Sequence, residues 1–218
     1  MRNCTTESSW LHKAALFELL SLGLRLPTPE LAEALSSGAY TDALKELAEL
    51  NGIAPDELSL ALAELAAYAG TGVDVLFHEL RTEYTHLYVG APKPAVSPYA
   101  GIWWAREAGV EPLLFVNRES LAVERFMRSC GIGQPEGTNE PLDHIASELE
   151  FLQYLCLIRA GATLPPELPD DFSLPEAAFE NFSATHFASW SKEFAEATIK
   201  EARAPFYRAV GRMLASLS

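Results

Sequence analysis

The sequence predicts an all-α protein, a single compact domain of about ten helices, and three observations support this prediction. Apolar residues recur at three- and four-residue steps along most of the chain. No segment of useful length alternates apolar and polar residues as a half-buried strand does. Hydrophobic residues make up 49% of the 218 positions, enough to bury a core. We expect one domain over residues 1–218, with two tightly packed halves, 1–90 and 103–218, joined by an ordered loop at 91–102.

The first half of the chain indicates one long helix followed by shorter ones. Apolar residues recur at helical spacing over residues 7–26, and Pro27 ends this helix because proline cannot continue it. Shorter amphipathic helices are expected in PELAEALSS, TDALKELAEL and PDELSLALAELAAYAG. The next segment, GVDVLFHELRTEYTHLYVG, places Tyr84, Leu87 and Tyr88 on one apolar stripe.

The second half begins with a proline-rich segment, APKPAVSPYAGIWW, which cannot be regular helix. It carries Tyr99 and Trp103 instead of the small polar residues of a linker, so we expect an ordered loop. Asn117 is suited to cap a helix in RESLAVERFMRSCG, and EPLDHIASELEFLQYL begins a largely buried helix expected over residues 140–160. Three further helices follow, around EAAFENF, through HFASWSKEFAEATIK and after Pro205.

The charge and cysteine content restrict the class of protein. Thirty acidic against sixteen basic residues give a formal net charge of −14, which argues against nucleic acid as a partner and favours a cationic one. The three cysteines, Cys4, Cys130 and Cys156, are widely spaced and indicate neither a disulfide framework nor a thiolate zinc site. Charged residues interrupt the N-terminal apolar run, and no stretch suffices for a membrane span, so we expect a cytoplasmic protein.

Successive residues of a helix are rotated by about 100°, and at this angle the helix expected over residues 140–160 has three stripes. The inward stripe consists of Leu142, Ile145, Leu149, Leu152 and Cys156. The stripe beside it is polar at its start and apolar thereafter, and consists of His144, Glu148, Phe151 and Leu155. The third is a polar edge formed by Asp143, Ser147, Glu150 and Tyr154.

Two interpretations of this helix are open. Acids in a first helical turn face the positive end of the macrodipole, so Asp143 can be a structural residue near the cap. Alternatively, Asp143 and Glu148 offer carboxylates to a guanidinium, with His144 as a third polar contact. Phe151 and Leu155 would then continue the surface for an apolar ligand segment, which suits a peptide with arginines followed by a hydrophobic run.

The same residues resemble a known family. EPLDHIASELEFLQYL resembles the signature of the TorD/DmsD-like chaperones, which recognise twin-arginine signal peptides of molybdoenzymes in the cytosol. EYTHLYVGAPKPAVSPYAGIWW is similar to the family's aromatic-x-x-Leu-aromatic segment and Pro-rich loop, and the C-terminal helices resemble the family's as well. One departure is that Ala100 and Gly101 stand where many members have Glu-Ser.

The resemblance implies an all-α fold, a non-enzymatic chaperone role, and a client enzyme bound through its twin-arginine signal peptide. It also implies transient contact with the membrane export machinery and a monomer or homodimer. We expect no cofactor, and no P-loop for a nucleotide occurs. With Phe151 added from the helix pattern, the expected signal-peptide site comprises Asp143, His144, Glu148, Tyr84, Leu87, Tyr88, Pro92, Ser97, Pro98, Tyr99, Trp103 and Phe151.

Two alternative functions stay open from the sequence. The first is a helical enzyme with a carboxylate–histidine metal site. Its candidate ligands lie on one side of a helix and are Glu79, Glu83 and His86. Glu-x-x-His is the spacing used in di-iron bundles, although such sites need this motif twice. This strip lies largely opposite the apolar stripe, where a solvated face is expected. The second alternative is a generic helical interaction module anchored by Trp103 and Trp104.

Overall fold

The computed structural model describes residues 2–110, 118–133, 141–163 and 177–217. Over these ranges the chain forms eleven α-helices, one short π-helix and two 3-10 turns, without a β-strand. In chain order the elements are α1 (Arg2–Leu24), α2 (Pro29–Ser37), α3 (Ala39–Leu50), α4 (Pro55–Leu65), η1 (Ala66–Tyr68), α5 (Val73–Tyr84), η2 (Thr85–Val89), α6 (Ala100–Glu107), α7 (Arg118–Ser129), α8 (Ile145–Arg159), α9 (Ala178–Thr185), η3 (Phe187–Ser189), α10 (Ser191–Glu201) and α11 (Pro205–Ala215). The all-α prediction is therefore confirmed.

The helix boundaries follow from residues with restricted backbones or capping side chains. At the start of α2, the Thr28 hydroxyl accepts the N–H of Leu31 at 3.4 Å, and Pro29 occupies the first helical turn. Gly38 ends α2 with φ of 86°, a left-handed conformation that side-chain-bearing residues rarely adopt. Pro55 and Pro205 open α4 and α11 in the same way as Pro29 opens α2.

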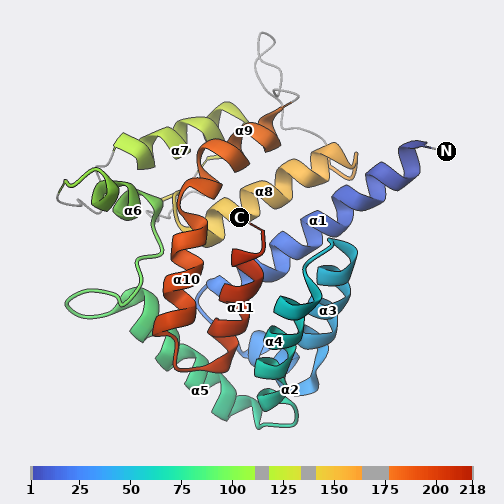
Figure 1. The fold of residues 1–218 in the computed structure, drawn as a ribbon, viewed down its shortest axis with the longest axis vertical. Helices are drawn as coiled ribbons and strands as arrows, with labels where there is room; N and C mark the ends of the chain where they lie inside the picture. Colours follow the sequence, from blue (N-terminus) through green and yellow to red (C-terminus); the bar gives the residue numbers. More distant parts are fainter. Residues whose placement is uncertain (1, 111–117, 134–140, 164–176, 218) are drawn as a thin grey trace.

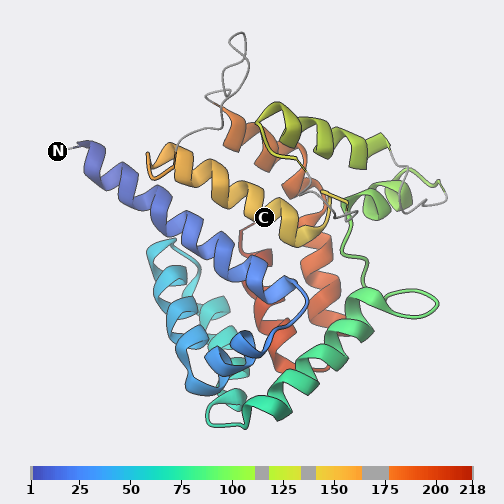
Figure 2. The ribbon, with the colours of Figure 1, turned by 180° about the vertical axis from the view of Figure 1, so that it is seen from behind.

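Two long helices that are far apart in the sequence pack against each other. α1 packs along α8 more extensively than any other pair of described helices, and both views show them side by side (Figures 1 and 2). α11 packs against α10 and α4, while α2, α3 and α5 complete the lower end. α7 and α9 lie on the other side of α8 from α1 (Figure 1). As a result, α8 is covered from several directions.

The interior is rich in aromatic rings, and the hydroxyls that they carry form hydrogen bonds. Tyr88 donates to the Thr198 hydroxyl at 3.3 Å and stacks on Phe194 at 5.7 Å between centroids. The Tyr207 hydroxyl donates to the Leu80 carbonyl at 3.1 Å, which joins α11 to α5. Among the residues that the structure describes, no buried hydroxyl lacks a hydrogen-bond partner, as expected because an unpaired buried polar group is costly.

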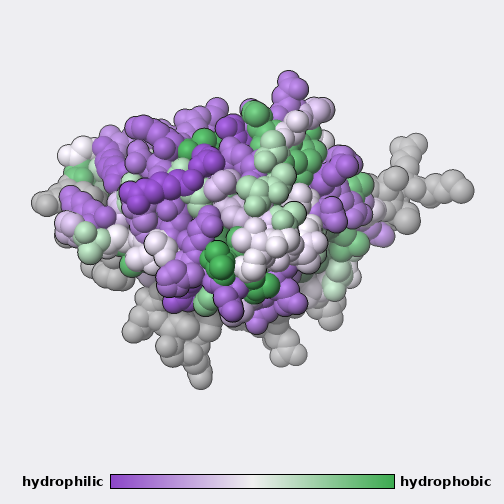
Figure 3. Space-filling model, turned by 90° about the horizontal axis from the view of Figure 1, so that it is seen from below, coloured by the Kyte–Doolittle hydropathy of each residue, from purple (hydrophilic) through white to green (hydrophobic). Residues whose placement is uncertain are grey.

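Most of the molecule's lower face is hydrophilic, with apolar residues gathered in a limited area (Figure 3). Two of the more exposed large apolar residues, Leu60 on α4 and Val75 on α5, are 47% and 63% exposed. Within the described ranges, no helix combines the length and the hydropathy that crossing a bilayer requires.

Several predicted boundaries need correction. The helix expected over residues 140–160 begins only at Ile145, whereas its end at Arg159 agrees with the prediction. The segment expected as one helix up to Tyr88 changes to a π-helical turn at Thr85. α6 begins at Ala100, inside the segment expected to be loop. Asn117, predicted as a cap, lies outside the described residues.

Glu83 is a further correction. It was expected on a solvated face, yet only 6% of it is exposed. One of its carboxylate oxygens accepts the backbone N–H of Arg203 at 2.5 Å and of Ala204 at 3.4 Å. The turn between α10 and α11 thus covers this side of α5, which a helical pattern alone does not reveal.

Candidate functional site

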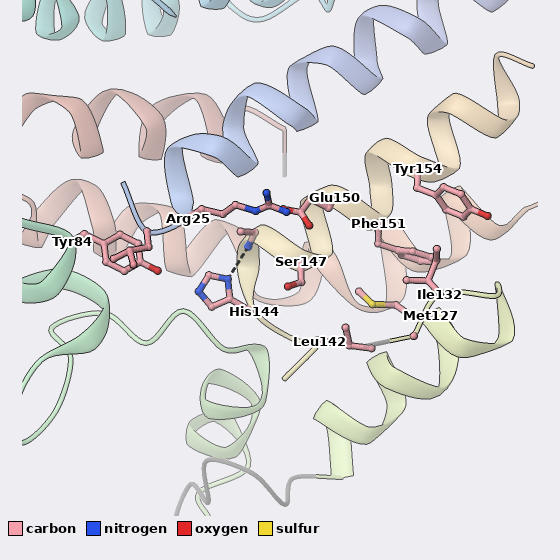
Figure 4. Close-up of a pocket in the computed structure, with 13 residues that line it drawn as sticks. Arg25, Tyr84, Met127, Ile132, Leu142, His144, Ser147, Glu150, Phe151 and Tyr154 are labelled. Carbon is pink, nitrogen blue, oxygen red and sulfur yellow. Dashed lines mark hydrogen bonds and ion pairs between the residues drawn. The ribbon is translucent and has the colours of Figure 1, made fainter. Parts of the chain in front are cut away.

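A cleft of about 600 Å³ opens where the C-terminal end of α1, the end of α7 and one edge of α8 meet (Figure 4). Its apolar walls are contributed by Leu26, Met127, Ile132, Leu142, Phe151 and Tyr154. Its main polar groups come from Arg25, Tyr84, His144, Ser147 and Glu150. Tyr84 lies at one end and Tyr154 at the other, with the polar groups of α8 between them (Figure 4). The cleft therefore joins a polar stretch to an apolar one.

The polar edge predicted for α8 lines this cleft for most of its length. Ser147, Glu150 and Tyr154 all face it, at the spacing of one helical turn. Asp143, predicted on the same edge, does not, because the chain leaves the helix before Ile145. The surface of α8 that lines the cleft is thus the edge next to the stripe on which sequence reasoning concentrated.

One ion pair spans the cleft. The Arg25 guanidinium reaches from the end of α1 to the carboxylate of Glu150 on α8 (Figure 4). The two side chains are 53% and 31% exposed. An ion pair at this exposure contributes only about 0–1 kcal/mol to stability. It therefore marks a charged position in the cleft rather than a strong structural bond.

His144 caps α8 and contributes its ring to the cleft. Its Nδ1 accepts the backbone N–H of Ala146 at 3.2 Å, and its ring contacts Tyr99 edge-to-face at 5.3 Å between centroids. Burial lowers the pKa of His144 to about 4, and the nearby Arg25 charge acts in the same direction. The imidazole is consequently neutral at physiological pH and acts as a hydrogen-bond acceptor.

Asp143 connects three helices instead of facing a ligand. Its Oδ2 accepts the backbone N–H of Gly101 at 2.9 Å and the hydroxyl of Ser120 at 2.6 Å, and its carbonyl accepts the N–H of Ala100 at 3.0 Å. Burial raises the pKa of Asp143, while these hydrogen bonds lower it. Because only 2% of Asp143 is exposed, this conformation leaves it no room for an incoming guanidinium.

Glu148 is entirely buried beneath the cleft. Its Oε2 accepts the indole N–H of Trp190 at 3.2 Å, and its Oε1 has no hydrogen-bond partner among the described residues. Burial raises the pKa of Glu148 well above its usual value, with the nearby Asp143 adding to the rise. Burial therefore favours the uncharged form of Glu148, and its fully enclosed side chain offers no contact to a ligand.

The stripe expected to continue the binding surface is also buried. Phe151 and Leu155 are 2% and 1% exposed. Phe151 packs edge-to-face on Phe182 of α9, with 4.7 Å between centroids, so only part of its ring borders the cleft. The expectation of an exposed stripe was wrong because α9 covers it.

The proline-rich loop meets the start of α8. The Pro98 carbonyl accepts the N–H of Ile145 at 2.9 Å, and Tyr99 forms an isolated bridge with His144. Ser97 is buried, and its carbonyl accepts the indole N–H of Trp103 at 2.8 Å. These contacts support the N-terminus of α8 from behind.

The remaining predicted site residues do not converge on one surface. Leu87 and Tyr88 are buried in the core, whereas the neighbouring Tyr84 lines the cleft. Pro92 is exposed on the loop, and neither Pro92 nor Trp103 lines the cleft. The structure thus brings Tyr84, His144 and Phe151 to the cleft out of the twelve predicted residues.

Sequence reasoning missed Arg25 and the contribution of α7. Arg25 follows the last turn of α1, where no pattern distinguishes it from an ordinary surface residue. Met127 and Ile132 border the cleft from α7 and the turn after it. Glu150 could have been selected, because it is the acid at the centre of the polar edge.

The carboxylate–histidine alternative finds no support in this geometry. Glu83 is turned to the backbone of Arg203, and Glu79 accepts the Tyr68 hydroxyl at 3.3 Å. Throughout the parts of the chain that the structure describes, no three His, Cys, Asp or Glu side chains are grouped to hold a metal ion.

The structure is an all-α protein with a cleft beside α8, and comparison with known proteins identifies its family. The family model described as nitrate reductase delta subunit matches residues 53–196, more than half of the chain. The chain therefore belongs to this family, which includes the TorD/DmsD-like maturation chaperones, as the sequence resemblance predicted.

Individual relatives are chaperones by name. The chaperone protein TorD of Aliivibrio fischeri is 28% identical over 199 residues, which cover 91% of this chain and 86% of the relative. The TorD of Photobacterium profundum is 30% identical over 136 residues, covering 62% and 59%. The Tat proofreading chaperone DmsD of Salmonella typhimurium is 28% identical over 153 residues, covering 70% and 64%. These names confirm the prediction of a chaperone rather than an enzyme.

Proposed function

We propose that the protein is a maturation chaperone that binds the twin-arginine signal peptide of a molybdenum-cofactor redox enzyme before export. The proposed binding place is the cleft between α1, α7 and α8. The observation that carries the proposal is the transition along one edge of α8, where the polar Ser147 and Glu150 are followed by the apolar walls at Phe151 and Tyr154. The printed names of the TorD and DmsD relatives support the same role.

A twin-arginine leader has the complementary pattern, since positively charged residues precede an apolar run. The chain's formal charge of −14 attracts such a peptide over a distance. In the cleft, its apolar residues would lie against Met127, Ile132 and Phe151, and its arginines near Glu150. In this proposal the protein acts in the cytoplasm, where the leader is still attached to its client.

The Asp-His signature supports this cleft instead of contacting the arginines. Asp143 fixes α6 and α7 relative to the start of α8, and His144 caps that start. Glu148 and the loop residues Ser97 to Tyr99 support the same region from within. Pro92 and Trp103, outside the cleft, are proposed contacts for parts of the client beyond its leader.

The affinity expected for this arrangement is moderate. Burying apolar surface of the leader contributes about 25 cal/mol per Å², but ordering a flexible peptide returns much of this gain. The result is a dissociation constant on the order of micromolar. A chaperone that must later release its client requires an affinity of this kind.

The test blocks the cleft with a single side chain. Ser147 lies on the cleft edge of α8 and is part-buried, so Ser147→Trp fills the space between the polar and apolar walls. We expect calorimetric titration with a client leader peptide to show a loss of at least about tenfold in affinity. Ser59→Trp, in the separate groove between α3 and α4, is the matched control and should bind normally.

Two results would contradict the proposal. One is equal affinity of wild type and Ser147→Trp when both are folded by circular dichroism. The other is a client whose binding survives removal of its leader, which would favour the generic interaction module instead.

A further inference from the structure

The Arg25–Glu150 pair gives the cleft a specific chemistry. Glu150 is the only carboxylate among the described residues that line the cleft, and Arg25 is the only permanently charged cation there. His144 is neutral for the reason given above. A guanidinium of the protein itself therefore occupies the one negative charge that the cleft presents.

We propose that Arg25 is a stand-in for an arginine of the bound peptide: it holds Glu150 in the empty cleft, and a peptide guanidinium takes its place on binding. The inference rests on the proposed function, because it assumes that the leader enters this cleft. In this proposal Glu150 is the residue that selects arginine, and competition from Arg25 sets the affinity for a peptide arginine.

The geometry favours such an exchange. Arg25 lies beyond the last residue of α1 and is 53% exposed, so its side chain can move into solvent without disturbing the helix. Glu150 is held on α8, a helix packed along α1, and is 31% exposed. Replacing one guanidinium by another conserves the ion pair, and the water that the peptide guanidinium gives up is offset by the water that Arg25 gains.

The exchange also explains a preference for arginine over lysine. A guanidinium is planar and presents several N–H donors in a fixed fork, whereas an ammonium is a compact point charge. A position on Glu150 that already accommodates a guanidinium has the shape for a second one. A lysine would replace the guanidinium with a point charge, and a peptide without a basic residue would displace Arg25 with no ion pair in return, so the stand-in disfavours both.

The experiment measures leader affinity for Arg25→Gln, Glu150→Gln and the double variant. Removing Arg25 takes away the guanidinium that competes for the Glu150 carboxylate, so we expect an arginine-bearing leader to bind Arg25→Gln about twofold to fivefold more tightly than wild type. Glu150→Gln should weaken binding of the same peptide. In the Glu150→Gln background, Arg25→Gln should no longer tighten binding, because no carboxylate remains to be freed.

Arg128→Gln is the matched control for net charge. Arg128 pairs with Glu124 on α7 at exposures of 59% and 28%, close to those of the Arg25–Glu150 pair, but it does not line the cleft. We expect Arg128→Gln to change affinity by less than Arg25→Gln does. Equal tightening by both would assign the effect to net charge and overturn the inference.

The outcomes separate this inference from the proposed function. If Ser147→Trp abolishes binding while Arg25→Gln leaves affinity unchanged or lowers it, the cleft binds the leader but Arg25 is not a stand-in. If wild-type protein does not bind the leader at all, both ideas fail.

Discussion

Asp143→Ala provides the sharpest test of how the cleft is supported. The substitution removes an acceptor that receives the Gly101 N–H at 2.9 Å and the Ser120 hydroxyl at 2.6 Å. A hydrogen bond to a charged acceptor contributes about 1.5–3 kcal/mol, and the cost of burying the carboxylate offsets part of the sum. We therefore expect the free energy of unfolding to fall by about 3 kcal/mol.

Urea denaturation followed by circular dichroism measures this change, and two variants divide it. Ser120→Ala removes one of the two donors and should cost about 1–1.5 kcal/mol. Asp143→Asn retains an oxygen acceptor but no charge, so its loss should be smaller than that of Asp143→Ala. An Asp143→Ala protein within about 0.5 kcal/mol of wild type would refute the reasoning, since that is the range of ordinary surface substitutions.

Three further predictions concern pH and peptide chemistry. Burial lowers the pKa of His144 in the folded protein to about 4, against a usual 6.5, so the folded form binds fewer protons than the unfolded chain between these values. This residue should therefore reduce the free energy of unfolding of the wild type by about 3 kcal/mol as the pH falls from 6.5 to 4. His144→Asn keeps a capping oxygen and removes this titration, so its stability, measured by urea denaturation at each pH, should fall less over that window; identical pH profiles would contradict the prediction. The raised pKa of Glu148 makes stability change with pH in the opposite direction, because the folded form retains a proton that the unfolded chain releases above about pH 4.5. Glu148→Gln does not titrate, so it should be more stable than wild type at pH 7, and the difference should disappear near pH 4. A variant less stable than wild type at pH 7 would count against this reasoning. Replacing both leader arginines by lysine should weaken calorimetric binding, whereas equal affinities would argue against a fork-shaped contact at Glu150.

The helical architecture was accessible from the sequence because it depends on local features. Apolar spacing identifies the helices, and residues such as Pro29, Pro55 and Pro205 fix where several of them begin. The change at Thr85 to a π-helical turn was not predicted, since the apolar stripe continues through it. Periodicity does not register how the backbone turns between two apolar residues.

The candidate site was less predictable because burial depends on neighbours distant in the sequence. A helical pattern places Glu148 and Phe151 on one stripe, but it does not show that Trp190 and Phe182 cover them. Pairing of Arg25 with Glu150 requires α1 to pack along α8, and nothing near Arg25 indicates that. The polar edge with Ser147 and Glu150 was visible, but only the packing of α7 shows that this edge lines a cleft.

The central claim is that a leader peptide lies in the cleft between α1, α7 and α8. A leader carrying a photoreactive residue directly after its arginines, crosslinked to the protein and mapped by mass spectrometry, tests this claim most directly. The account predicts crosslinks to fragments that contain Ile132, Phe151 or Tyr154. Crosslinks confined to the groove at Ile53 and Leu62, or to the loop around Pro92, would contradict it.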